Sequence, residues 1–305
     1  LSKTFTFIWC PVFIKYPCNI ITIFVICVSL SFPNVPGVIA NVYEIPSSEY
    51  SYGNFAIVFI EANAPFVSLP CNGFAPGPNG SPALLPSGVF YQHTTSIIGN
   101  GVALNIPYLI KEIQSIVDRG VPKPHILVSD RAQILMPYHV LFDTYEEARL
   151  AGKSFGSTKS GIAPFYSDKY AKIGFQLAEL FDEAYALDKL ERVLEVKNVT
   201  LEHLYHKPCL SAREVFDGLR KQRDAIAPYV GDTFQFLREA QAQGKRILLE
   251  GQLGAMKDPD FGIYPMVTSS STLAGYGAIG AGIPPYEIKN ITTVVKAYSS
   301  AVGQG

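Results

Sequence analysis

The feature that most constrains this 305-residue chain is an alternation, from residue 96 onwards, of short apolar runs and segments with helical periodicity. Residues 107–119 carry apolar side chains at helical spacing and are followed by Gly120, a common helix stop. The run HILVS at 125–129 and the run RILLE at 246–250 have the continuous apolar character of strands buried in a parallel sheet.

The rest of this region repeats the same pattern. Further helices are predicted at 145–150, 171–187, 212–227 and 232–242, and a further strand at 291–298. Strands that alternate with helices predict an α/β fold with an open, mainly parallel sheet flanked by helices. Ligands bind beyond the carboxyl ends of such strands, so the loop after 246–250 is the first candidate for a site.

The first third of the chain has a different texture. Residues 20–32 form an almost unbroken apolar run of 13 residues, shorter than the roughly 20 residues that a membrane-spanning helix needs. A membrane anchor or leader and a segment foreign to the remainder are both open, and the second is favoured. Residues 33–95 are rich in Pro and Gly, which predicts loops around a single strand at 55–61.

Composition limits the kind of partner and the compartment. The formal net charge of −1 and the pI of about 6.6 give no electrostatic reason to expect nucleic-acid binding. The five cysteines are unevenly placed, and none has the CxxC or Cys/His spacing of a zinc site. We therefore expect free thiols and a cytoplasmic protein, with no metal held by cysteine.

Two hydroxyl-rich loops are the best candidates for ligand binding. The stretch DPDFGIYPMVTSSST at 258–272 follows the strand at 246–250, and FGSTKSG at 155–161 combines hydroxyls, glycines and a lysine. Backbone amides and hydroxyls in such loops can cradle a phosphate, although each loop could also be a plain Ser/Gly turn. Asp258 and Asp260 suit either a metal site or the capping of a turn, and capping is favoured.

Other catalytic patterns are weaker. Gly152-Lys153-Ser154 matches the tail of a phosphate-binding P-loop, but Glu147 stands where that pattern needs its first glycine. No serine or cysteine nucleophile lies in a recognisable arrangement with a histidine. His139, in the run PYHVLFD, is expected to be a core or helix-capping histidine.

Taken together, the motifs resemble one family, adenylosuccinate synthetase. The resemblance covers residues 85–305 and is carried, in the family's order, by LPSGVF (85–90), SIIGNGVAL (96–104), VSDRAQIL (128–135), GSTKSGIAPFYSDKYAKIG (156–174), LLEGQLGAMKDPDFGIYPMVTSSST (248–272) and VVKAYSSAVGQG (294–305). It implies a P-loop-NTPase-like α/β fold and a ligase of purine biosynthesis. That enzyme joins IMP and L-aspartate into adenylosuccinate, using GTP and Mg²⁺, through 6-phosphoryl-IMP.

The resemblance also implies an IMP-binding set. Thr158 matches a threonine that contacts the IMP phosphate, and Thr268 matches a second IMP-binding threonine. Lys172 stands where the family has an arginine that reaches the IMP of the neighbouring subunit, which implies a homodimer and loses the bidentate fork of arginine. Leu253 stands where the family has an IMP-binding glutamine, and the adjacent Gln252 could supply that contact after a local shift.

The departures from the family are large. The G-D-E-G-K-G-K loop, with its catalytic base and magnesium site, and the G-H-T segment with its acid histidine have no match, so the ligands of GTP and Mg²⁺ are not identifiable. We expect three parts: an apolar segment at 1–35, an irregular Pro/Gly-rich segment at 36–84, and a family-like core at 85–305. The fold is expected to be incomplete at both ends and the chain inactive as given. A non-catalytic nucleotide-binding or membrane-tethered protein is the alternative.

Overall fold

The computed structural model describes residues 21–27, 66–70, 75–76, 82–83, 85–151, 157–251 and 254–295. Its main sheet is built from strands β1 (Ile21–Cys27), β2 (Phe66–Pro70), β5 (Thr94–Ile98), β7 (His125–Ser129), β9 (Val230–Gly231), β10 (Arg246–Gly251) and β11 (Ile288–Val295). The strand order is β11-β1-β10-β2-β5-β7-β9, and every pair is parallel. The predicted open, parallel α/β sheet is therefore confirmed.

Two short strand pairs lie outside the main sheet. Strands β3 (Ala75–Pro76) and β4 (Pro82–Ala83) are antiparallel, whereas β6 (Ala103–Leu104) and β8 (Gln133–Ile134) are parallel. Short 3-10 helices occupy η2 (Ser87–Phe90), η4 (Leu177–Phe181), η5 (Ala227–Tyr229), η6 (Ala255–Lys257) and η7 (Pro285–Glu287).

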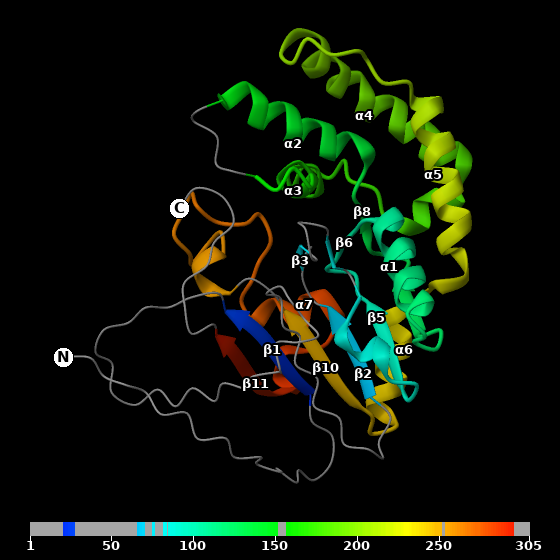
Figure 1. Ribbon diagram of the computed structural model, residues 1–305, viewed down its shortest axis with the longest axis vertical. Coiled ribbons are helices and arrows are strands. Elements are labelled where there is room, and N and C mark those ends of the chain that lie inside the picture. The colour runs from blue at the N-terminus through cyan, green and yellow to red at the C-terminus, as the bar shows by residue number, and fades with distance from the viewer. Residues whose placement is uncertain are drawn as a thin grey trace, which may run out of the picture.

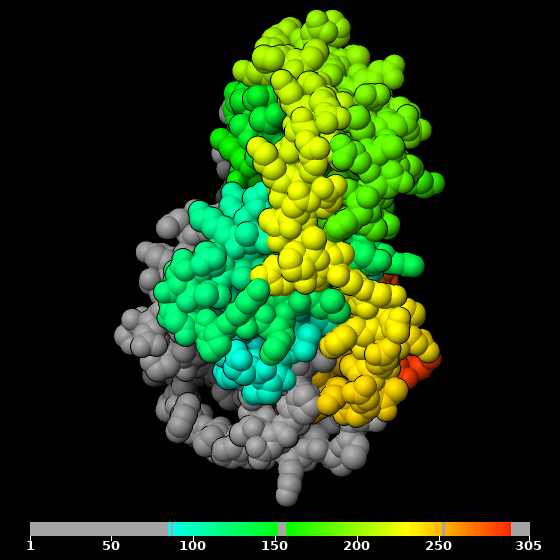
Figure 2. Space-filling view, turned by 90° about the vertical axis from the view of Figure 1, so that its right-hand side faces the viewer, coloured from blue at the N-terminus to red at the C-terminus, as the bar shows by residue number. Residues whose placement is uncertain are grey.

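The α-helices form two groups (Figure 1). Helices α1 (Ile106–Asp118), α6 (Thr233–Ala242) and α7 (Gly275–Ala281) cover the sheet, whereas α2 (Pro137–Leu150), α3 (Ile162–Tyr170) and α4 (Glu183–His203) stand beyond it. Helix α5 (Ala212–Ile226) packs against both α1 and α4 and so joins the two groups. Figure 2 shows it as a yellow band that runs along the molecule from the helical group toward the sheet.

Helices cover both faces of the sheet. Because neighbouring residues of a strand point to opposite sides, each strand contributes side chains to the packing on both faces. Ile98 belongs to a buried cluster with side chains of α1, α4 and α5, including Leu109. Its neighbour Ile97 belongs to a second cluster with side chains of α6 and β10, including Leu237 and Leu249. This two-sided burial explains why the three central residues of each run, 126–128 and 247–249, are all apolar.

Strands β1 and β2 lie inside the sheet although they come from the first third of the chain. Strand β1 pairs with β10 from Ile21 opposite Ile247, and with β11 on its other edge. Part of the apolar run at 20–32 is thus a strand of the sheet. Within the described ranges, no helix is both long and apolar enough to cross a membrane. The strand predicted at 55–61 lies outside the described residues.

The helices predicted at 107–119, 212–227 and 232–242 are found with ends shifted by at most one residue, and the one predicted at 145–150 is only the end of α2, which begins eight residues earlier. The helix predicted at 171–187 is wrong. The chain turns at Lys172, whose φ of +64° is left-handed, then forms η4. A new helix, α4, starts where the Asp182 carboxylate accepts a hydrogen bond from the Tyr185 amide at 3.0 Å. The apolar residues of η4 and of the start of α4 together have helical spacing, so the sequence pattern predicted a single helix where the structure has two elements.

Candidate functional site

The two hydroxyl-rich loops differ in their position. The loop at 254–274 follows β10 and leads into α7, where the strand–helix alternation predicts a site. The loop at 157–161 leads into α3, in the group of helices that stands beyond the sheet. Figure 1 shows the first loop, in orange, on the side of the sheet toward α3. Lys169 of α3 reaches Tyr276 of α7, with Nζ 3.4 Å from Oη, so the two regions are in contact.

Asp258 organises the first loop. The residue is 3% exposed. Its Oδ1 accepts hydrogen bonds from the amides of Asp260 (3.0 Å) and Phe261 (3.1 Å), and its Oδ2 accepts one from the Thr272 amide (2.8 Å). Burial alone would raise the pKa of this carboxyl, but the backbone donors hold it below its ordinary value. The predicted capping role of Asp258 is confirmed.

Part of the hydroxyl run is structural rather than free for a ligand. Thr272 is fully buried, and its Oγ1 donates to the Gly254 carbonyl at 2.7 Å. Gly262 is needed because a Cβ there would lie 2.3 Å from the Met256 carbonyl oxygen. The loop is therefore folded tightly against its own first turn.

Thr268, the residue predicted to bind IMP in this loop, has a fixed backbone. Its amide donates to the Lys257 carbonyl at 2.8 Å, and Lys257 Nζ in turn donates to the Met266 carbonyl at 2.9 Å. Thr268 is half-buried. The backbone around the Thr268 hydroxyl is thus fixed by Lys257 at two residues, Met266 and Thr268 itself.

The second loop is tied to α2. The Ser157 hydroxyl donates to Asp143 Oδ1 at 2.6 Å, and the Gly161 amide donates to Asp143 Oδ2 at 2.8 Å. Gly161 has a φ of +82°, and a Cβ there would lie 2.8 Å from the backbone of α2. Thr158 lies between these ties, exposed, with its hydroxyl in contact with the Ser160 hydroxyl. The loop is shaped by α2 rather than by its own sequence alone.

A buried network behind this loop joins α2, α3 and α4. His139 is 1% exposed and its Nδ1 accepts a hydrogen bond from the Met136 amide at 3.0 Å. Nε2 therefore carries the proton and donates to Asp168 Oδ2 at 2.9 Å, while Lys197 Nζ meets Asp168 Oδ1 at 2.5 Å. His139 is both a core and a helix-capping histidine, as predicted.

Lys169 connects the two loop regions through a contact that the sequence did not indicate. It projects from α3 toward α7, and burial lowers the pKa of its ammonium group. A lysine in a helical segment is normally read as solvated, and its partner Tyr276 is more than a hundred residues away. Only the proximity of two predicted loops could have suggested it.

The other predicted residues have different outcomes. Lys172 is exposed just after α3, so it and Thr158 lie at opposite ends of that helix. Gln252 and Leu253 lie outside the described residues, between the end of β10 and Gly254. The structure thus brings the Thr158 and Thr268 loops to one side of the molecule, and it leaves the glutamine position untested.

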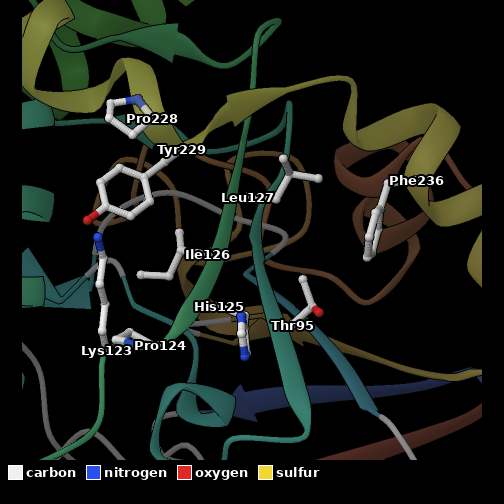
Figure 3. Close-up of a pocket in the computed structure, with 9 residues that line it drawn as sticks. All are labelled: Thr95, Lys123, Pro124, His125, Ile126, Leu127, Pro228, Tyr229 and Phe236. Atoms are coloured by element: carbon white, nitrogen blue, oxygen red, sulfur yellow. The ribbon is translucent and has the colours of Figure 1, made fainter.

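Among the described residues, neither a metal centre nor the cavity of Figure 3 is found beside the two loops. The part of the chain that the structure describes forms no group of three His, Cys, Asp or Glu side chains able to hold a metal ion. That cavity, of about 410 Å³, instead lies at the amino end of β7, lined by His125, Lys123, Tyr229, Phe236 and neighbours (Figure 3). It is at the opposite end of that strand from the carboxyl edge of the sheet.

The open parallel sheet flanked by helices defines an α/β protein. Its two hydroxyl-rich loops are each held by a buried carboxylate. The family model "Adenylosuccinate synthetase" matches residues 79–305, and the chain belongs to that family. Residues 1–78, with β1 and β2, precede the matched residues.

Individual relatives agree. The adenylosuccinate synthetases of Dehalococcoides mccartyi and Bacillus cytotoxicus are 42% and 41% identical over 222 residues, which are 73% of this chain and 52% of each relative. The chain therefore spans about half the length of the curated relatives it matches. A solved structure of fully ligated adenylosuccinate synthetase from Plasmodium falciparum has a TM-score of 0.67 and 29% identity, covering 80% of this chain and 58% of that one.

Proposed function

We propose that this chain carries the IMP-binding part of an adenylosuccinate synthetase, the ligase that joins IMP and L-aspartate at the expense of GTP. The observation that carries this proposal is the pair of loops bearing Thr158 and Thr268, which match the family's IMP-binding threonines and lie toward one edge of the sheet. Both loops are tied by buried carboxylates, Asp143 and Asp258, so their donors are preorganised.

In this proposal the described residues bind and orient IMP. The Thr158 hydroxyl donates to the 5′-phosphate, and Thr268 holds the same nucleotide from the other loop. Such positioning is what phosphoryl transfer to the 6-oxygen of IMP requires, because that chemistry depends mainly on alignment and charge neutralisation. GTP and Mg²⁺ are implied by the family alone, and no residue of the described ranges is assigned to them.

A homodimer in the cytoplasm belongs to the same proposal. Helix α3 has nine residues and is therefore about 13 Å long, which separates Thr158 from Lys172. Within one chain these two side chains would not meet the same phosphate. An exposed Lys172 at the far end of α3 is suitably placed to serve the nucleotide of a second copy, as the family's arginine does.

The first test is calorimetric titration of the chain with IMP, compared with Thr158→Val and Thr268→Val. A hydrogen bond to a charged phosphate contributes about 1.5–3 kcal/mol, so each variant should bind IMP roughly ten-fold more weakly or worse. Thr144→Val is the matched control, since the Thr144 hydroxyl bonds within its own helix to the Val140 carbonyl at 2.8 Å. Absence of binding at millimolar IMP would remove the proposal.

Turnover is the second test. Adenylosuccinate formation from IMP, GTP, Mg²⁺ and aspartate by this chain would establish the ligase and would contradict the expectation that the chain is inactive as given. A non-catalytic nucleotide-binding protein that retains the fold is the alternative, and it predicts IMP binding without any turnover. The family membership favours the ligase.

A further inference from the structure

Asp143 is a buried carboxylate that the family resemblance did not single out. It lies on α2, one turn after His139 and on the same face, and is 7% exposed. Both of its oxygens point to the loop at 157–161, where they accept from the Ser157 hydroxyl at 2.6 Å and the Gly161 amide at 2.8 Å. One carboxylate therefore holds both ends of a five-residue loop.

The interior of the loop is held through the same contacts. Ser157 Oγ, while donating to Asp143, accepts a hydrogen bond from the Lys159 amide at 3.0 Å. Lys159 has a φ of +56°, a backbone conformation that costs a non-glycine residue about 1–2 kcal/mol unless its surroundings impose it. The hydrogen bonds from Ser157 to Asp143 and from Lys159 to Ser157 hold this backbone conformation in place. They therefore fix the position of the residue next to Thr158.

The choice of an acid at this position is informative. A negative charge beside a loop that binds a phosphate works against the ligand, unless the charge is used to hold donors in place. An ionised carboxylate can only accept, so it compels both the Ser157 hydroxyl and the Gly161 amide to point toward α2. The shape of the loop, and with it the place of the Thr158 hydroxyl, then follows from α2.

We propose that Asp143 is a positioning residue for nucleotide phosphate binding: it sets the loop at 157–161 so that Thr158 meets the phosphate of IMP. The inference rests on the proposed function, because it takes IMP as the ligand. Asp143 does not touch the nucleotide. It acts through Ser157 and Gly161, and its effect falls on the phosphate rather than on the base or the ribose.

The test compares the affinities of the 305-residue chain for IMP and for inosine, which lacks the phosphate. The dissociation constant for inosine divided by that for IMP isolates the phosphate contribution, and this inosine-to-IMP ratio does not change with the fraction of folded protein. Asp143→Ala should reduce this ratio roughly 10–100-fold, the range expected for losing one or two oriented hydrogen bonds to a charged group. Ser157→Ala, which removes only the relay, should reduce it less.

The conservative variant sharpens the expectation. Asp143→Asn can turn its oxygen to the Gly161 amide and its NH₂ to Ser157 Oγ, because a hydroxyl can accept whereas a backbone amide cannot. The ratio of dissociation constants in Asp143→Asn should therefore stay much closer to the wild-type value than the ratio in Asp143→Ala. If Asp143→Ala does not fold, Ser157→Ala still decides the matter, because an unchanged ratio in that variant would overturn the inference.

Asp168→Asn is the matched control. Asp168 is an equally buried carboxylate that ties α3 to α2 and α4 through His139 and Lys197. Its substitution should lower the melting temperature but leave the inosine-to-IMP ratio of dissociation constants within about two-fold of the wild-type value. A wild-type chain that binds IMP no better than inosine overturns both proposals. A wild-type preference for IMP that Asp143→Ala preserves overturns only the role of Asp143.

Discussion

Single buried side chains determine how the helices beyond the sheet are joined. Asp168 lies between His139 and Lys197, so one carboxylate of α3 connects α2 to α4. Burial alone would raise the pKa of Asp168, but the hydrogen bonds from His139 and Lys197 hold it below its ordinary value of 3.8. The stability it contributes is therefore complete above that pH and is lost only as the pH falls below it.

His139 makes the same network sensitive to milder acid. Burial lowers the pKa of its imidazole below the ordinary 6.5, and Nδ1 already accepts a hydrogen bond that protonation would break. The unfolded chain then binds a proton first as the pH falls. The free energy of unfolding should decrease below pH 6.5, by at most about 1.4 kcal/mol per pH unit for one proton.

Urea unfolding at pH 7.5, 6.5, 5.5 and 5.0 measures this dependence. His139→Gln should be less stable at pH 7.5 by about 1–3 kcal/mol, because a buried donor and acceptor are lost or strained. It should also show a flatter decline between pH 6.5 and 5.0. His125→Gln, at an exposed histidine, controls for removing an imidazole. If the unfolding free energy of His139→Gln declines with pH as steeply as that of the wild type, the pH dependence arises from a group other than His139.

At the scale of elements, the loop at 254–274 depends on Asp258, which caps two amides close to it in sequence and one that is 14 residues away. Asp258→Ala should leave the amides of Asp260, Phe261 and Thr272 without their acceptor. We expect a loss of about 2–3 kcal/mol in local stability, seen as faster hydrogen exchange at these three amides. Asp260→Ala, an exposed change in the same turn, should leave exchange at Thr272 unchanged. Equal exchange in both variants would contradict the capping role.

The sequence predicted the elements that have strong local signals and missed those defined by distant contacts. The apolar run at 125–129 was sufficient to predict β7, and Asp258 was correctly interpreted as a cap because its partners Asp260 and Phe261 are its neighbours. Helix α3 was not predicted, because it is short and contains Pro164. Its position depends on contacts of α2 with residues about 20 to 30 positions later, which no local pattern contains.

The candidate site divides in the same way. The resemblance predicted IMP binding by Thr158 and Thr268, since the motifs around them are long and distinctive. The residues that hold those loops, Asp143 and Thr272, are ordinary side chains whose importance follows from burial and partners. Lys169 belongs with them, because only folding brings it to Tyr276.

At the scale of the whole molecule, the sheet depends on two strands that precede the family-matched residues. Strand β1 separates β11 from β10, and β2 separates β10 from β5. Strand β10 pairs with β1 from Ile247 onwards and with β2 from Arg246 onwards. Without these partners β10 would present two open parallel edges, and the buried residues Ile247 and Leu249 would lose their lateral neighbours.

Deletion of residues 1–84 should therefore prevent formation of a cooperative fold rather than release a compact core. We expect the truncated chain to elute as aggregate in size-exclusion chromatography and to unfold without a sharp transition, because unpaired edges and apolar faces associate. Deletion of residues 1–20 is the matched control, since β1 begins at Ile21 and both strands are retained. A monodisperse 85–305 fragment with undiminished affinity for IMP would show that the sheet forms without β1 and β2, and that the matched residues alone carry the nucleotide site.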